Sequence, residues 1–240
     1  MQTFHSQLLN KFPNLTHTFT GKKDGNLAFH VGDDETNIIY NHQKLAQKLS
    51  YTLKTVVHMK QIHSDIVKVV TDEDNFKNPP TCDAIITNKK KTPLMVMVAD
   101  CSPILFYDPQ KEVIAAAHAG RAGAFSNIIQ NIIDTFTQEF HSKVEDIVVT
   151  VGPAICVECY EVGEEIYKEA KKRKMEYALT QTEDKYHLNI RAILQKQLRE
   201  AGVKERNFEI SAHCSKCHSD FFSYRENKKC GRFAGVIMLR

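Results

Sequence analysis

Two histidines and one cysteine in this chain are residue types that hold a catalytic zinc ion. His63 lies in the run Gln-Ile-His, Cys101 in Ala-Asp-Cys and His118 in His-Ala-Gly. Two imidazoles and one thiolate form a catalytic zinc site when the fourth position is left open for water or substrate. The three residues are far apart in the sequence, and this spacing alone is equally compatible with three unrelated buried residues.

Each of the three residues stands next to an apolar run that predicts a β-strand. Cys101 follows Leu-Met-Val-Met-Val, which is apolar on both faces, as in a buried strand. His118 follows Val-Ile-Ala-Ala-Ala and precedes an amphipathic helix, and His63 precedes Ile-Val-Lys-Val-Val. Loops at strand ends are held by a rigid scaffold and commonly carry function. The local sequence therefore puts all three residues where they could converge.

Apolar periodicity predicts several strands and a few helices. Residues 125–136 have apolar side chains at i, i+3, i+4, i+7, i+8 and i+11, which is one face of an α-helix. Residues 190–201 repeat this pattern, with Asn189 as N-cap and Gly202 as the stop. Further helices are expected over 43–49 and 161–174, and strands over 66–70, 84–87, 94–98, 104–107, 113–117, 147–151, 208–212 and 233–239.

This irregular mixture predicts an α/β (α+β) sandwich of mixed β-sheets with helices on the outer faces. We expect one domain over residues 1–240, because a chain of this length can bury a self-sufficient core. No G-x-G-x-x-G motif follows a predicted strand, which argues against a dinucleotide-binding fold.

Composition is ordinary for a soluble globular protein. The net charge of +3 is weak, and a nucleic-acid binder more often concentrates basic residues on one face. The longest dense apolar stretch, residues 94–99, is too short to span a bilayer, and residues 1–17 lack the features of a secretion signal. We therefore expect a cytoplasmic protein that binds neither nucleic acid nor membranes. Oligomeric state does not follow from the sequence.

Two Cys-x-x-Cys pairs form a second group of metal-ligand residues. They are Cys156 with Cys159 and Cys214 with Cys217, among seven cysteines in all. Together they could form a four-cysteine structural zinc site, a redox pair or a set of reduced structural thiols. The sequence between the pairs is much longer than in ordinary zinc ribbons, which favours reduced thiols.

Two weaker patterns are compatible with substrate binding. Backbone N–H groups of the segment 120–123 could receive a phosphate at the start of a helix, although a simple tight turn explains the same glycines. Near the C-terminus, aromatic residues at 221–224 precede Arg225, and Arg232 follows. Arginine grips phosphate or carboxylate and an aromatic ring stacks on a base, but a core aromatic pair beside a surface arginine is the plainer explanation.

A set of short motifs runs in order through almost the whole chain. They are Gln61-Ile62-His63-Ser64, Asp83-Ala84, Ala99-Asp100-Cys101-Ser102-Pro103-Ile104-Leu105, His118-Ala119-Gly120, Gly152-Pro153-Ala154-Ile155, Tyr160-Glu161-Val162-Gly163, Ser223-Tyr224-Arg225 and Gly231-Arg232. By this set the chain resembles the YfiH/YlmD-like family. Its members were once called polyphenol oxidoreductase laccases and are now regarded as zinc-containing purine nucleoside phosphorylases with adenosine deaminase activity.

The resemblance implies a metal site and its neighbours. His63, Cys101 and His118 correspond to the metal ligands, with Zn²⁺ as the cofactor and Cu²⁺ as an alternative or adventitious metal. Asp83 and Asp100 correspond to active-site neighbours of the catalytic Cys101. Asp83 is expected to assist proton transfer, and Asp100 to support the site from behind.

The resemblance also implies a substrate side. Gln61, Tyr224 and Arg225 correspond to substrate-binding residues, with Arg225 as a phosphate or ribose contact. The expected partners are a purine nucleoside and phosphate. Two departures bear on this prediction, because the family motif His-Ala-Gly-Trp-Arg-Gly reads His-Ala-Gly-Arg-Ala-Gly here, and an arginine of the family's N-terminal segment is replaced by lysines. The displaced Arg121 is therefore not expected to bind phosphate.

The resulting hypothesis is a phosphorylase of adenosine, inosine or methylthioadenosine that also deaminates adenosine. One alternative uses the same site for amide hydrolysis, with Cys101 as nucleophile and His118 as base, since the family's fold is shared with a deamidating toxin domain. A related version keeps the zinc and cleaves a peptidoglycan precursor in an editing role. A second is copper-dependent phenol oxidation. The 11 histidines form no His-x-His pair of the multicopper type, although copper would bind the same trio strongly. A metal-free binding module is the non-enzyme alternative.

Overall fold

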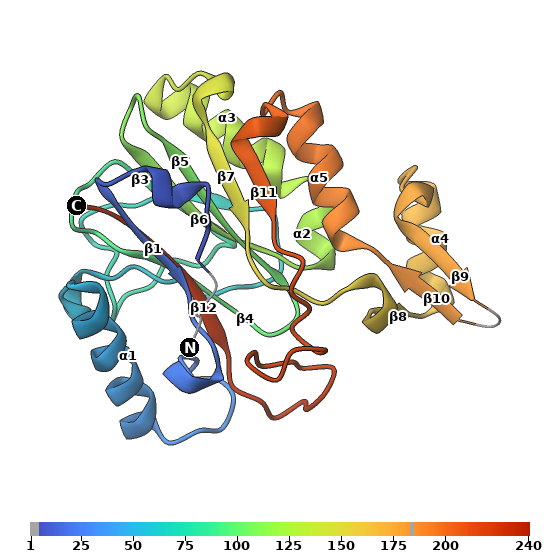
Figure 1. Ribbon diagram of the computed structural model, residues 1–240, viewed down its shortest axis with the longest axis horizontal. Helices are drawn as coiled ribbons and strands as arrows, with labels where there is room; N and C mark the ends of the chain where they lie inside the picture. The colour runs from blue at the N-terminus through green and yellow to red at the C-terminus, as the bar shows by residue number, and fades with distance from the viewer. Residues whose placement is uncertain (1–4, 183–184) are drawn as a thin grey trace.

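The computed structural model describes residues 5–182 and 185–240, and a six-stranded mixed sheet lies at its centre (Figure 1). The strand order is β11-β7-β5-β6-β3-β2. The pairs β2–β3 and β7–β11 are parallel, and the other neighbours are antiparallel. The strands are β2 (Val67–Val69), β3 (Ala84–Thr87), β5 (Ser102–Asp108), β6 (Val113–Ala119), β7 (Val148–Val151) and β11 (Phe208–Ile210).

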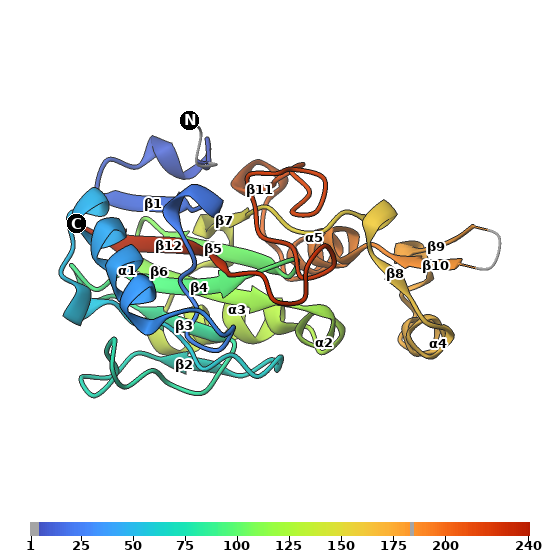
Figure 2. The same cartoon turned by 90° about the horizontal axis from the view of Figure 1, so that it is seen from below.

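Two smaller sheets accompany the central one. An antiparallel sheet of order β1-β12-β4 consists of β1 (Leu15–Phe19), β12 (Phe233–Leu239) and β4 (Leu94–Val98). A sheet of order β8-β10-β9 projects at one end of the molecule together with helix α4 (Figures 1 and 2). These last elements are β8 (Glu161–Val162), α4 (Glu164–Lys172), β9 (Leu179–Thr182) and β10 (Lys185–Leu188).

The central strands are buried on both faces, which explains why their sequences are apolar throughout. Alternate side chains of a strand point to opposite faces of its sheet. Along β5, Ile104 and Phe106 join one hydrophobic cluster, whereas Leu105 and Tyr107 join another. The first cluster includes the helices α3 (Ile128–Phe140) and α5 (Ile190–Glu200), and the second includes the β1-β12-β4 sheet. The sheet is thus the middle layer of a sandwich.

Helix α1 (Glu35–Leu49) covers the outer face of the β1-β12-β4 sheet (Figure 2). Its Leu45 packs in a third cluster with Met95 of β4 and Val236 of β12. The side chain of Asp34 caps this helix by accepting a hydrogen bond from the backbone N–H of Thr36. The predicted arrangement of mixed sheets with helices on the outer faces is therefore confirmed.

The helix predicted over 125–136 is divided in the structure. Phe125 closes a short helix, α2 (Arg121–Phe125), and α3 begins three residues later. Asn127 separates the two helices because it adopts a left-handed conformation (φ 58°) and its side chain caps α3. The apolar pattern continued across the break because Phe125 is buried in the same cluster as α3.

Other predicted elements differ from the observed ones in extent. The strands predicted over 84–87, 94–98 and 233–239 coincide with β3, β4 and β12, and α5 has the predicted Asn189 cap. The charged helix predicted over 161–174 begins later, because residues 161–162 form β8. The helix predicted over 43–49 is the second half of α1. None of the described helices is long and apolar enough to cross a bilayer.

The packing of α3 on the sheet gives a stability prediction. Ile132 of α3 is fully buried between the helix and the sheet. Substituting Ile132→Ala removes buried methylene groups and leaves a cavity, so we expect unfolding to become easier by about 2–5 kcal/mol. Urea denaturation measures this change. The control is Val69→Ala at an exposed strand position, which should lower the free energy of unfolding by about 0.5 kcal/mol or less. Equal losses in the two variants would contradict the packing of α3 on the sheet.

Candidate metal centre

His63, Cys101 and His118 meet at one edge of the six-stranded sheet. Their ligand atoms all lie within 4.8 Å of one another. The topology explains this convergence, because β6 runs antiparallel to β5 and β3, and β2 runs parallel to β3. The end of β6, which carries His118, therefore lies beside the starts of the other three strands, where Cys101 precedes β5 and His63 precedes β2. The predicted convergence of the trio is present in the structure.

The carboxylate of Asp83 connects the two ligand histidines to each other. Its Oδ1 accepts hydrogen bonds from His118 Nδ1 at 2.8 Å and from the backbone N–H of His63 at 3.1 Å. Its Oδ2 accepts from the backbone N–H of Ile62 and from both the N–H and the hydroxyl of Ser64, at 3.2, 2.7 and 2.7 Å. The bond to Nδ1 fixes the His118 ring and leaves Nε2 as the atom for a metal.

Electrostatics around the trio favour the charged forms of Cys101 and His118. Burial alone would raise the pKa of the Cys101 thiol, but the His118 and His63 imidazoles outweigh it and lower that pKa to about 6. Burial would lower the pKa of His118, but the Cys101 sulfur and the Asp83 carboxylate raise it to about 9. The Cys101 sulfur is therefore a thiolate at neutral pH, which is the form that binds metal.

The backbone at Gly120 lies close to two of the three ligands. Gly120 follows the last residue of β6, and a Cβ atom there would lie 3.1 Å from Cys101 Sγ and 3.2 Å from His63 Cδ2. A side chain at position 120 would therefore press on both ligands, which glycine avoids. His63 itself has a left-handed backbone (φ 59°), which is held by the hydrogen bond of its N–H to Asp83.

A cavity of about 980 Å³ opens over the three ligands. The predicted substrate-side residues Gln61, Tyr224 and Arg225 all line it. The amide of Gln61 pairs with the backbone of Met97 in β4, through bonds of 2.8 and 3.0 Å. The Arg225 guanidinium donates a hydrogen bond to the carbonyl of Glu161 and lies 4.8 Å from the centre of the Tyr160 ring.

Asp100 lines the same cavity and connects distant segments of the chain. Its Oδ1 accepts a 2.7 Å hydrogen bond from the Ser215 hydroxyl, and its Oδ2 accepts one of 2.7 Å from the backbone N–H of Arg225. Its carbonyl accepts from the backbone N–H of Ile155. Asp100 has φ 90°, a conformation that L-residues rarely adopt and that these three bonds hold in place.

Arg121, the residue displaced from the family motif, contacts helix α4 and its own helix α2. Its guanidinium donates a 2.8 Å hydrogen bond to Glu169 of α4 and lies over the Phe125 ring. Arg121 is not among the residues that line the cavity. The exclusion of Arg121 from substrate binding therefore agrees with its position.

Comparison with known proteins places the chain in a family. The family model described as multi-copper polyphenol oxidoreductase laccase matches residues 18–240. The chain belongs to this family, the YfiH/YlmD-like family. It is 35% identical over 215 residues to a purine nucleoside phosphorylase of Streptomyces coelicolor, covering 89% of this chain and 87% of that protein. It is 30% identical over 227 residues to adenosine deaminase RL5 from an unknown prokaryotic organism, covering 87% and 86%.

Solved YfiH/YlmD-like structures have the same fold. YfiH of Bacillus licheniformis superposes with a TM-score of 0.90 at 29% identity, covering 97% of this chain and 94% of that one. YlmD of Geobacillus stearothermophilus gives a TM-score of 0.90 at 28% identity, covering 95% and 93%. The predicted family and fold are thus confirmed, and relatives in the family are named as enzymes of purine nucleosides.

An aromatic group beside the YfiH/YlmD-type centre was missed in the sequence. Phe29, His58 and Phe76 line the cavity, and the Phe76 ring contacts Phe29, His42 and His58 at centroid distances of 6.0, 4.9 and 5.5 Å. Phe29 remains 40% exposed. These residues lie outside any regular strand or helix pattern, except for His42 of α1. Periodicity therefore gave no indication that they form one wall.

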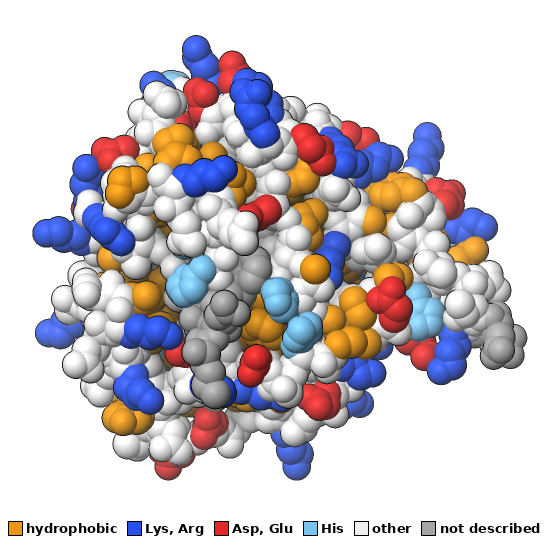
Figure 3. Space-filling view, in the orientation of Figure 1, with side chains coloured by type: hydrophobic (Ala, Val, Ile, Leu, Met, Phe, Trp, Pro, Cys, Tyr) orange, Lys and Arg blue, Asp and Glu red, His pale blue; other side chains and the backbone are white. Residues whose placement is uncertain are grey.

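Charges of both signs are interspersed over the face of the protein seen in Figure 3. Lys and Arg side chains alternate there with Asp and Glu side chains rather than gathering in a basic stripe. This distribution agrees with the weak net charge of +3.

The double role of Asp83 gives a prediction for metal binding. In the Asp83→Asn variant, a neutral amide replaces the carboxylate that orients His118 and the backbone of residues 62–64. We expect the affinity for zinc to fall by about 10- to 100-fold. Competition with a chromogenic chelator measures it. Asp108→Asn is the matched control, since Asp108 is also buried but binds the backbone of Gln110 and Lys111 instead; equal affinity in the two variants would refute this role of Asp83.

Proposed function

We propose that the protein is a zinc-dependent purine nucleoside phosphorylase of adenosine, inosine or methylthioadenosine, with adenosine deaminase activity. The observation that carries the proposal is the three-ligand set of His63, Cys101 and His118 on the floor of a cavity with aromatic and basic walls. The names of relatives in the family support the same substrate class.

The donor set suits zinc. One thiolate and two imidazoles are typical zinc ligands, and three protein ligands leave a position for water or substrate. When bound, zinc supplies a Lewis acid that lowers the pKa of a water molecule to about 7. His118 contributes Nε2 because Asp83 holds Nδ1, and Cys101 contributes a sulfur that is already ionised at neutral pH.

The contacts favour roles for Asp83 and Asp100 opposite to those that the family resemblance implies, which were proton transfer for Asp83 and support of the site for Asp100. Asp83 is fully buried, and its five hydrogen bonds suit it to orient the ligands rather than to move protons to substrate. Asp100 lines the cavity beside Cys101. We therefore assign Asp100 the transfer of protons to and from the purine, and Asp83 the positioning of His118.

Different walls of the cavity suit the purine base and the phosphate. The rings of Phe29 and Phe76 offer apolar faces on which a purine can stack, and Tyr224 adds a third ring. Arg225 and Arg232 bring positive charge to the lining, with Arg232 lying 5.8 Å from the Tyr224 ring centre. Arginine binds phosphate oxygens through its planar fork, so Arg225 is our candidate for the site of the phosphate nucleophile.

The proposal is tested by incubating metal-analysed protein with adenosine, with and without phosphate, and separating the products. Adenine with ribose-1-phosphate in the phosphate arm supports phosphorolysis, and inosine in both arms supports deamination. Inosine alone would reduce the function to a deaminase, and no turnover of adenosine, inosine or methylthioadenosine would refute it.

Loss of one ligand should abolish catalysis. In Cys101→Ala the remaining imidazoles bind zinc poorly, and we expect kcat/KM for phosphorolysis to fall by about 1,000-fold or more. The control is Cys230→Ser, because Cys230 belongs neither to this ligand set nor to the group formed by the two Cys-x-x-Cys pairs. Phosphorolysis that persists undiminished in Cys101→Ala would overturn the zinc mechanism.

Two arginines allow a matched test of the phosphate site. Arg225→Ala removes a guanidinium from the cavity, and we expect the KM for phosphate to rise by about 10- to 100-fold, as for loss of a charged hydrogen bond. Arg121→Ala, which removes the pair with Glu169 and the contact with the Phe125 ring, should leave that KM unchanged. Initial rates at varied phosphate measure both, and equal effects would remove Arg225 from the phosphate site.

One alternative shares an observation with this proposal. The contact of Cys101 with His118 and the lowered pKa of the thiol also suit a cysteine nucleophile with a histidine base, as in amide hydrolysis. A thiolate that binds zinc is not a free nucleophile. Stoichiometric zinc in protein purified without added metal therefore favours the phosphorylase, and zinc-free active protein favours the hydrolase. Copper in place of zinc would support the oxidase activity that the family name describes.

A further inference from the structure

The two Cys-x-x-Cys pairs form a second cluster of sulfur atoms away from the first ligand set. The ligand atoms of Cys156, Cys159, Cys214 and Cys217 all lie within 4.8 Å of one another. All four are free thiols, and Sγ of Cys159 lies 3.4 Å from Sγ of Cys217. The long sequence between the pairs, which argued against a shared site, does not keep them apart.

Sheet topology brings the two pairs together. Cys156 follows β7 and Cys214 follows β11, and these two strands are parallel neighbours. Parallel strands end at the same edge of a sheet, so the segments that follow them start side by side. The pairing continues past the strands, because Ala154 forms a bridge with Cys214, and Ser215 N–H donates to the carbonyl of Ala154 at 3.1 Å.

The arrangement of the sulfur atoms suits a tetrahedral ion. Zinc binds thiolates at about 2.3 Å, which puts the four sulfur atoms of a tetrahedral four-thiolate site about 3.8 Å apart. The observed cluster needs only small side-chain shifts to reach this geometry. Backbone N–H groups of Cys156 and Cys217 point to Sγ of Cys214 at 3.3 and 3.5 Å. Such donors stabilise a thiolate.

A half-buried cation, Arg191, lies beside the cluster. Arg191 of α5 donates hydrogen bonds to the carbonyls of Ala154, Ala212 and His213, so its guanidinium holds the segments after β7 and β11 together. Burial lowers the pKa of Arg191, and the charges of Cys214 and Cys156 oppose that shift. Four thiolates around a divalent cation carry a net negative charge, which this guanidinium is placed to offset.

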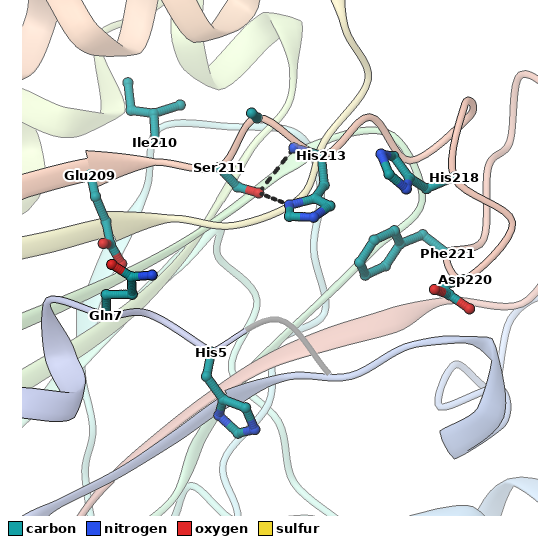
Figure 4. Close-up of a pocket in the computed structure, with 10 residues that line it drawn as sticks. His5, Gln7, Glu209, Ile210, Ser211, His213, His218, Asp220 and Phe221 are labelled. Carbon is teal, nitrogen blue, oxygen red and sulfur yellow. Dashed lines mark hydrogen bonds between the residues drawn. The ribbon is translucent and has the colours of Figure 1, made fainter. Parts of the chain in front are cut away.

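The histidines next to the second pair have other contacts. His213 and His218 line a separate pocket of about 630 Å³ with Phe221, and Figure 4 shows the Ser211 hydroxyl bonded to His213. The two imidazole rings pack against each other at 4.9 Å. Among the described residues, the metal-ligand group at this place consists of the four cysteines alone.

We propose that Cys156, Cys159, Cys214 and Cys217 bind one zinc ion in a closed structural site. Four protein ligands leave no position for substrate, so this ion has no part in the chemistry of the first centre. Its effect is on position, because the bridged segments continue into both sides of the substrate cavity. One leads directly to Tyr160, and the other carries Ser215, which binds Asp100.

Metal counting on a set of variants tests the proposal independently of activity. We expect about two zinc ions per chain in protein expressed with zinc, and about one in Cys101→Ala, where only the four-cysteine site is intact. Adding Cys156→Ser and Cys214→Ser to Cys101→Ala should remove the last ion, whereas adding Cys230→Ser should not. A Cys101→Ala protein without zinc overturns the proposal. If His63, Cys101 and His118 bind no zinc, wild type and Cys101→Ala both hold one ion, so failure of the first centre is distinguishable.

Cobalt substitution identifies the ligands without relying on the serine variants to fold. Thiolate-to-cobalt charge-transfer absorption grows with the number of sulfur ligands, so Cys101→Ala loaded with cobalt should show roughly four times the intensity expected of one thiolate. Thiol titration of the metal-depleted, unreduced protein completes the test. Release of the ion should expose four reactive thiols; a disulfide within the cluster, found by mass, would establish a redox pair and overturn the zinc site.

Discussion

The arrangement of the metal centre depends on one buried carboxylate, that of Asp83. It lies at the start of β3, directly opposite the end of β6, and reaches both the imidazole of His118 and the backbone of the 62–64 turn. Burial would raise the pKa of Asp83, but the bonds from His118 and Ser64 outweigh it and lower the pKa to about 2. The pKa of this group is lower in the folded protein than in the unfolded chain. Its stabilising effect is therefore complete above the unfolded pKa and is lost only as pH falls toward 2.

A second carboxylate organises the other side of the cavity. Asp100 binds segments that begin at Ile155, Ser215 and Arg225, and all of them lie in irregular structure. Irregular segments form few backbone hydrogen bonds of their own. Hydrogen bonds to a carboxylate at the end of a strand can therefore hold these segments in place without disturbing the sheet. The three candidate ligands thus lie at strand ends of the sheet, whereas Ile155, Ser215 and Arg225 belong to irregular segments that Asp100 holds beside it.

The parts of the fold that could be predicted from the sequence are those encoded locally. The runs that became β4 and β12 are buried on both faces and bounded by turn residues, so their limits were predicted correctly. The break at Asn127 was missed because a capping asparagine does not interrupt apolar spacing. β1 was missed because its Leu-Thr-His-Thr-Phe sequence contains polar residues, of which His17 and Thr18 are nevertheless buried in the folded chain. The parallel pairing of β7 with β11 is nonlocal, and no spacing rule within either strand indicates it.

The contrast between local and nonlocal features also explains why the candidate metal ligands were easier to predict than the residues that line the cavity. A metal selects residue types, and the choice of cysteine and histidine beside strand ends narrows the candidates before any fold is known. The shape of the cavity depends on residues that the fold brings together, and the rings of Phe29, Phe76, Tyr160 and Tyr224 that line it come from separate segments. Nothing in the local sequence of Phe29 and Phe76 distinguishes them from ordinary buried or surface residues, and Tyr160 and Tyr224 were indicated only by the motifs of the family. Their common position is a property of the folded chain.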